Sequence, residues 1–214
     1  MFAILPALGA DFKNIRGGGG PGRDPTLGGM LPLDDPRWTA LAHRNWSPGQ
    51  RPGDDPSVPF VPQELRLLLS DPADLARFTD LWPYLCSEDT AWPAAYAAVP
   101  YLVELARRLR PAERGDYLYV VGFIVICSGS YGQTSPGLPE DIASAYRQAL
   151  PDALSLITEQ LATAQGLMDT RYYLAATAAL KGFPAFGEFL NNLEASLECE
   201  ACGETVGGLP EGLA

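Results

Sequence analysis

From residue 34 onward, apolar residues recur every three or four positions along most of the chain. Leu75, Phe78, Leu81, Trp82 and Leu85 follow one another at this spacing, which places them on one face of a helix. No stretch alternates apolar and polar residues as a half-buried strand does, and no Asn-Gly pair indicates a hairpin. The pattern therefore predicts an all-α protein, with helices over 36–42, 61–69, 72–85, 92–109, 113–128, 140–164, 169–180 and 184–197.

Residues that start, bend or stop helices support these boundaries. Asp35-Pro36 combines an N-capping side chain with proline at the first helical position, and Ser70-Asp71-Pro72 indicates another start. Gly182 is expected to end the helix over 169–180. Prolines lie within three other predicted helices. We expect the helix to bend or end at Pro83, and to bend at Pro100 and Pro151.

Two of the predicted helices depend on packing as well as on periodicity. Residues 113–128 are apolar nearly all round and fit either a buried helix or a buried strand; their helical neighbours favour the helix. In the helix over 184–197, Phe186, Phe189, Leu190 and Leu193 share a face. We expect that face to pack inward.

Composition divides the chain into three parts. Residues 1–33 are rich in glycine and proline, including the run Gly17–Gly20, and predict an N-terminal arm because such a segment has little apolar surface to bury. Residues 34–197 contain the predicted helices. Residues 198–214 form an acidic tail with a Cys-x-x-Cys pair.

The helices follow one another in pairs, and two helices in roughly 40 residues is typical of HEAT-type repeats. Two stretches are similar to bacterial HEAT-repeat proteins. The first is Asp34–Trp38, followed by the helix over Val61–Leu69 and by Ser70-Asp71-Pro72, and the second is Leu81–Leu85 followed by Thr90–Leu102; residues 86–89 depart from the pattern. Some of those proteins are encoded beside secreted polymorphic toxins and are taken to be their immunity proteins. The resemblance covers about residues 34–109. It implies a HEAT-like α-solenoid of stacked helical hairpins, and a protein-binding role as an inhibitor.

The charge balance limits the kinds of partner. The chain has 15 basic and 26 acidic residues, a net charge of −11, with 47% hydrophobic and 19% charged residues. Such a surface repels nucleic acid and anionic lipid and suits a basic protein. The longest apolar run, 117–127, is about half the ~20 residues that a membrane-spanning helix needs. The N-terminus lacks the basic residues of a signal peptide. We therefore expect a cytoplasmic protein.

Acidic loops beside tryptophans are the predicted partner-binding residues. Aromatic anchors flanked by charge are typical of protein interfaces, although carboxylates at these positions also cap helices and the tryptophans also fit a core. If they form an interface, the partner is a basic protein such as a toxin. The predicted residues are Trp46, Asp54, Asp55, Glu88, Asp89 and Trp92.

The candidate metal ligands are Cys199 and Cys202, which with Gly203 resemble half of a zinc knuckle. Tetrahedral zinc needs four ligands, so Cys86, Cys127, His43 or a second chain would have to complete the site. A redox dithiol and a plain terminal segment also fit. The surrounding glutamates would raise the thiol pKa and disfavour the redox role.

No arrangement of residues indicates catalysis. His43 has no carboxylate or cysteine at motif spacing and is expected to be a surface or capping residue. Cys127–Gly132 resembles a nucleophile motif but also fits a turn between helices. The sequence therefore predicts a non-catalytic protein-binding module that requires no cofactor. A zinc-binding scaffold is the second hypothesis. An enzyme on a HEAT-like scaffold is the third, and the acidity disfavours it. The oligomeric state stays open.

Overall fold

The computed structural model describes residues 29–45, 55, 57–87 and 90–192, and the backbone of 197–198 and 205–206. Most of these residues are helical, so the all-α prediction is confirmed. The α-helices are α1 (Val61–Ser70), α2 (Leu75–Leu81), α3 (Pro93–Arg108), α4 (Gly115–Cys127), α5 (Glu140–Leu161), α6 (Gly166–Leu180) and α7 (Pro184–Asn191). Short 3₁₀ turns cover Pro36–Ala40, Trp82–Tyr84 and Pro111–Glu113.

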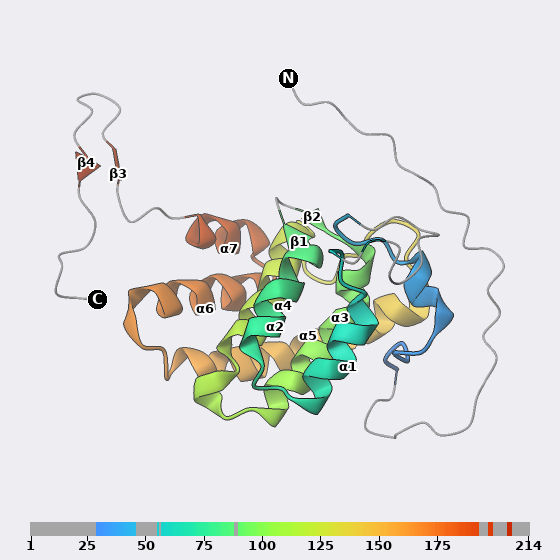
Figure 1. Cartoon of the computed structure of the whole chain (residues 1–214). Helices are drawn as coiled ribbons and strands as arrows, with labels where there is room; N and C mark the ends of the chain where they lie inside the picture. Colours follow the sequence, from blue (N-terminus) through green and yellow to red (C-terminus); the bar gives the residue numbers. More distant parts are fainter. Residues whose placement is uncertain are drawn as a thin grey trace.

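The helices are arranged as antiparallel pairs whose members pack on the corresponding members of the next pair. α3 lies along α5, α4 lies along α6, and α1 packs on α3 (Figure 1). Phe78 of α2 and Tyr117 of α4 place their rings 4.2 Å apart. α7 folds back on α6 and also contacts α4. The result is a stack of helices with α4 near its centre.

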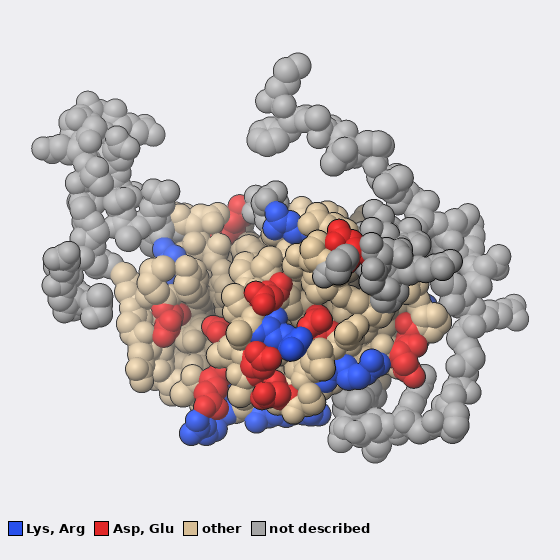
Figure 2. All heavy atoms as spheres, viewed as in Figure 1, with Lys and Arg blue, Asp and Glu red and all other residues tan. Residues whose placement is uncertain are grey.

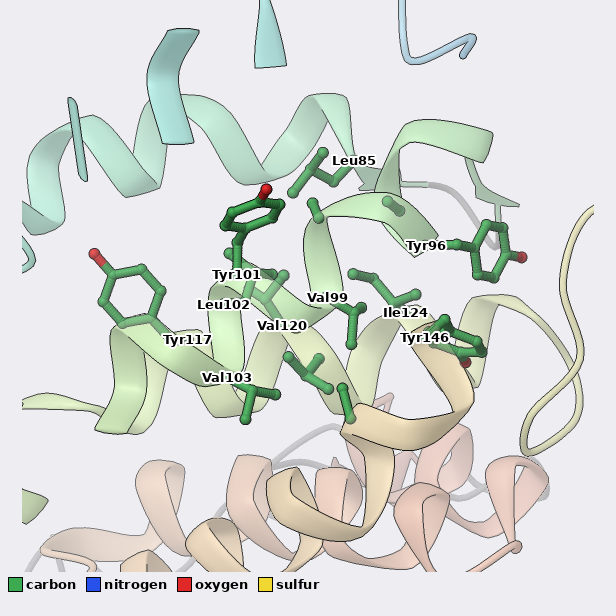
Figure 3. Close-up of a cluster of buried hydrophobic side chains, with 14 of the residues drawn as sticks. Leu85, Tyr96, Val99, Tyr101, Leu102, Val103, Tyr117, Val120, Ile124 and Tyr146 are labelled. Carbon is green, nitrogen blue, oxygen red and sulfur yellow. The ribbon is translucent and has the colours of Figure 1, made fainter. Parts of the chain in front are cut away.

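α4 corresponds to residues 113–128, for which the sequence fitted either a buried helix or a buried strand. It is apolar on every side and is covered by α3, α5, α6 and α7, so the prediction of a buried helix is confirmed. Val120 and Ile124 point toward Val99 and Leu102 of α3 in the core (Figure 3). A helix can bury all its sides only when neighbours surround it, which explains why no polar stripe marks its sequence.

Local start and stop signals are confirmed in part. The Asp35 carboxylate accepts a hydrogen bond from the Arg37 N–H at 2.8 Å. Gly182 has a φ of +90° and ends α6, with its N–H donating to Ala179 O at 2.9 Å. The start predicted at Ser70-Asp71-Pro72 is wrong, because Asp74 caps α2 by accepting from the Arg77 N–H at 3.0 Å.

The prolines inside predicted helices have different outcomes. At Pro83 the α-helix gives way to a 3₁₀ turn, Trp82–Tyr84, as the sequence predicted. Pro100 and Pro151 lie inside α3 and α5, which continue past them. Neither proline ends its helix, although each withholds one backbone N–H from it.

Two short strand pairs are present that the sequence pattern did not indicate. β1 (Cys86–Ser87) pairs with β2 (Thr90–Ala91), and β3 (Leu197–Glu198) pairs with β4 (Thr205–Val206), both antiparallel. Strands of two residues are too short to show an alternating pattern in a sequence. β1 and β2 lie between the turn after α2 and the start of α3, and β3 and β4 follow α7; the described strands form no central sheet.

The packed part of the chain includes residues that composition assigned to the N-terminal arm. Leu31 is buried in the core, and its carbonyl accepts a hydrogen bond from the Tyr101 hydroxyl at 2.6 Å. Pro32 O accepts from the Trp38 indole at 2.9 Å. The segment 29–45 is therefore fixed against α3 by polar as well as apolar contacts.

The last helix contradicts its predicted orientation. Phe186 and Phe189 are 56% and 59% exposed, whereas Leu190 packs against the core. Leu193 lies outside the described residues. Periodicity showed that one side of this helix is apolar, but the structure turns Gly187 toward α6, so close that an added Cβ would lie 2.7 Å from Ala175 O.

Candidate functional site

Most predicted site residues lie outside the part of the chain that the structure describes. Asp55 and Trp92 are described. The remaining partner-binding residues and both predicted metal ligands are not: Trp46, Asp54, Glu88, Asp89, Cys199 and Cys202.

Asp55 lies at the surface beside the first two helices. Its carboxylate accepts hydrogen bonds from the Ser57 N–H at 2.9 Å and the Ser57 hydroxyl at 2.6 Å, and these bonds lower the pKa of Asp55. The Ser57 carbonyl in turn accepts from the Tyr84 hydroxyl at 3.2 Å. The Asp55 turn is therefore held against the 3₁₀ turn that follows α2.

A surface pocket of about 620 Å³ opens beside this turn. It is formed by α1, α2 and the segment before α1, which come together because Leu65 and Leu68 of α1 and Phe78 of α2 are buried beneath them. The polar sides of both helices remain above that core. The pocket is lined by Ser57, Pro59, Glu64, Asp74, Ala76, Arg77, Asp80, Leu81 and Tyr84.

Arg77 holds two of the carboxylates of the pocket. Its guanidinium donates to Glu64 at 2.7 Å and to Asp74 at 3.1 Å, and the bond to Glu64 is the main reason that the pKa of Arg77 is raised. Asp74 also caps α2. Among the described residues, Asp80 is the carboxylate of the pocket without an ion pair or hydrogen bond, and it is exposed.

The pocket therefore has three carboxylates and one guanidinium. Figure 2 shows basic atoms ringed by acidic ones in the middle of the face formed by α1 and α2. Excess negative charge beside the exposed Tyr84 hydroxyl suits electrostatic binding of a cationic side chain. Sequence reasoning did not identify Glu64, Asp74, Arg77, Asp80 and Tyr84 as a group. The three-residue spacing of Asp74 and Arg77 is the local signal for their ion pair.

Trp92 occupies a different place, at the start of α3. The backbone N–H of Trp92 donates to Leu85 O at 3.0 Å, which connects the start of α3 to the end of the turn after α2. The ring is half-buried, and its indole nitrogen is buried with no hydrogen-bond acceptor in the described ranges. Trp92 does not line the acidic pocket.

His43 is buried, so the prediction of a surface or capping residue is wrong. It is 3% exposed and lies edge-on to Tyr84, with ring centroids 6.2 Å apart. Its Nδ1 donates to the Arg44 carbonyl at 3.1 Å. Loss of water around the ring lowers the pKa of His43 to about 4.

The cysteine and serine candidates for chemistry are packed into the fold. Burial raises the pKa of the Cys86 thiol, and Cys127 adds to this effect. Within the described ranges, no three or more of the His, Cys, Asp and Glu residues gather as metal ligands would. The Ser128 hydroxyl donates to the Ile124 carbonyl at 2.6 Å, and Gly129 and Gly132 have positive φ, so the predicted turn after α4 is confirmed.

Comparison with known proteins gives no further guide. No family model, curated protein or solved structure matches the chain. In the described part of the chain, no helix combines the length and the apolar character that crossing a membrane requires.

Proposed function

We propose that the chain is a non-catalytic protein-binding module that binds a basic segment of a partner protein in the pocket between α1 and α2. The pocket, with three carboxylates against one guanidinium, is the observation that carries this proposal. The net charge of −11 adds long-range attraction for a basic protein. More narrowly, the module is an immunity-type inhibitor that acts in the cytoplasm by covering a basic toxin.

Within the proposal, the two sides of the pocket have different roles. The bonds from Arg77 keep Glu64 and Asp74 in place, so these carboxylates form a fixed wall. Asp80 is exposed and pairs with an incoming lysine or arginine. The Tyr84 ring offers a face for the same cation. Charged pairs of this kind raise the association rate and restrict the choice of partner.

The proposal includes a HEAT-type α-solenoid as the scaffold. The packing of α3 on α5 and of α4 on α6 supports it, since successive hairpins of a solenoid contact each other through equivalent helices. The short α2 and the folding of α7 back onto α6 are irregular features of such a stack.

A charge-reversal variant tests the pocket. Asp80→Lys places a cation where the partner's cation would bind, and we expect it to weaken binding of an oligo-arginine peptide at least tenfold in fluorescence anisotropy at low salt. The matched control is Asp169→Lys on α6, which changes the net charge equally at an exposed site outside the pocket. Equal losses of peptide affinity in the two variants would show that only the net charge matters, and would contradict binding in the pocket.

The same pair of variants tests the natural partner. Wild-type protein used as bait should co-purify with a basic protein, identified by mass spectrometry and compared with the products of neighbouring reading frames. The Asp80→Lys bait should lose that protein and the Asp169→Lys bait should keep it. Retention by Asp80→Lys would place the binding surface elsewhere.

A zinc-binding scaffold is the second candidate, favoured by one observation. β3 and β4 pair so that Glu198 is opposite Thr205, and the strands therefore bracket residues 199–204, which include Cys199 and Cys202. Two thiolates supply half of a tetrahedral site, so we expect one zinc per two chains. Metal analysis of the purified protein checks this, with the Cys199→Ser, Cys202→Ser double variant as control. A zinc content near zero would remove the candidate.

A further inference from the structure

The charges on α2 alternate in sign along the acidic pocket. Asp74, Arg77 and Asp80 follow one another at intervals of three residues, and all three line the pocket. Residues at this spacing lie on neighbouring turns of a helix, about 4.5 Å apart along its axis. We call these three residues the charge stripe. Because its order is negative, positive, negative, a ligand that carries only positive charge matches its two ends but not its centre.

Arg77, at the centre of the charge stripe, keeps a hydrogen-bond donor free. Its Nε donates to Asp74 at 3.1 Å and its Nη1 donates to Glu64 at 2.7 Å. The other terminal nitrogen, Nη2, is not buried and makes no hydrogen bond to the described residues. A ligand that covers Arg77 removes water from this nitrogen. An unpaired donor on a charged group is costly, so the ligand must bring an acceptor.

The carboxylates on either side of Arg77 can still receive cations. Asp80 is exposed and has no ion pair within the described part of the chain. At the other end, Glu64 accepts from Arg77 through Oε2, and its Oε1 makes no hydrogen bond to a described residue. A carboxylate can accept about four hydrogen bonds in all. Both ends of the charge stripe therefore have room for a lysine or an arginine.

We propose that the ligand of the acidic pocket is a helical segment whose charges run in the reverse order: basic, acidic and basic at three-residue spacing. This inference rests on the proposed function, in which the pocket binds a basic segment of a partner protein. A helix lying along α2 has the same rise as α2, so its three charges meet Asp80, Arg77 and the Glu64–Asp74 end in turn. The order is the same in both directions, so parallel and antiparallel helices both fit.

The alternating order fits the pocket better than a run of basic residues does. In such a run, a third cation would face the Arg77 guanidinium, and like charges in contact reduce affinity. The alternating segment keeps a net positive charge, so the three carboxylates of the pocket still attract it. Ala76, which lines the pocket beside Arg77, is exposed and carries only a methyl group, so the backbone of the segment can come close.

Two peptides of identical composition test the charge order. In one uncharged, alanine-rich helical host, the first carries Lys-Ala-Ala-Glu-Ala-Ala-Lys and the second Lys-Ala-Ala-Lys-Ala-Ala-Glu, and circular dichroism checks that both are equally helical. We expect the first to bind the wild-type protein about tenfold more tightly in fluorescence anisotropy at low salt, because only it places a carboxylate between two cations. Equal affinities, or binding of neither peptide, would overturn the charge order.

Arg77→Gln tests which group recognises the acidic position. Glutamine is neutral, so we expect the two peptides to bind this variant alike. The matched control is Arg147→Gln on α5, which removes the same charge from an ion-paired arginine outside the pocket, 45% exposed against 36% for Arg77, and should keep the wild-type preference. Urea unfolding checks that both variants are folded. A preference that survives in Arg77→Gln would overturn the proposal. Failure of the proposed function gives a different result, in which oligo-arginine binds Asp80→Lys as tightly as wild type.

Discussion

Replacing Gly122 with alanine is expected to lower the free energy of unfolding by about 3 kcal/mol, the upper end of the usual range for overpacking. α4 and α6 approach so closely at this residue that an added Cβ would lie 2.4 Å from the Cβ and 2.5 Å from the Cα of Ala176. A backbone atom cannot rotate away, so the two helices must separate. Alanine forms helices more readily than glycine, by about 1 kcal/mol, so helix propensity alone would make the variant more stable. A loss of stability would therefore come from the close packing.

Gly115→Ala provides the matched control at the start of the same helix. There the added Cβ would meet the end of the Tyr173 side chain, at 2.0 Å from its hydroxyl oxygen. A side chain can move, so we expect a smaller loss of stability than at Gly122. Urea unfolding with an unchanged m-value measures both. Equal stability of Gly122→Ala and wild type would contradict the close packing of α4 on α6.

Much of the helical fold could be predicted because helices leave a periodic signal in the sequence. The spacing of apolar residues located α3, α5 and α6 to within a few residues, and the helical neighbours of 113–128 correctly favoured a helix. Orientation is different, since it depends on which neighbour covers which side. Phe186 and Phe189 share an apolar face, but Gly187 provides the closer contact with α6 and leaves them exposed. Periodicity cannot tell whether the phenylalanine side or the Gly187 side of α7 faces α6.

The acidic pocket was less predictable for a related reason. Its carboxylates come from two helices, and the 2.7 Å contact between Arg77 and Glu64 joins residues 13 positions apart. Only the Asp74–Arg77 pair lies within one helical turn. Single charges on polar helix faces are common, so no one of these residues stands out in the sequence. Folding of α2 against α1 is what turns them into a group.

The burial of His43 is determined by tertiary contacts, because the sequence around it carries no pattern that indicates burial. His43 follows the 3₁₀ turn Pro36–Ala40, in a segment that packs across the end of another hairpin. Ala42 O accepts from the Ala94 N–H at 3.1 Å, and the Arg44 N–H donates to Tyr84 O at 3.1 Å. These two bonds hold the ring of His43 between α3 and the turn after α2. Its burial therefore has a consequence for stability.

Below pH 6.5 the protein is expected to lose stability through His43. The pKa of this residue is about 4 in the folded state and 6.5 when the ring is in water. As the pH falls from 6.5 toward 4, the unfolded chain takes up a proton that the folded chain excludes, so the free energy of unfolding decreases. A difference of this size corresponds to about 3 kcal/mol over the whole window. Above pH 6.5 the contribution of His43 is constant.

The variant His43→Asn isolates this effect. Asparagine keeps an N–H near the Arg44 carbonyl but does not ionise, and it leaves the carboxylates that titrate below pH 5 in place. We expect the variant to be less stable than wild type at pH 7, where it loses packing against Tyr84, and the gap to narrow as the pH falls from 6.5 to 4. Urea unfolding at half-unit pH steps measures the difference. If the free energies of unfolding of the two proteins changed in parallel over this window, His43 would have the same pKa in the folded and unfolded chains. That result would contradict the enclosure of the ring between α3 and Tyr84.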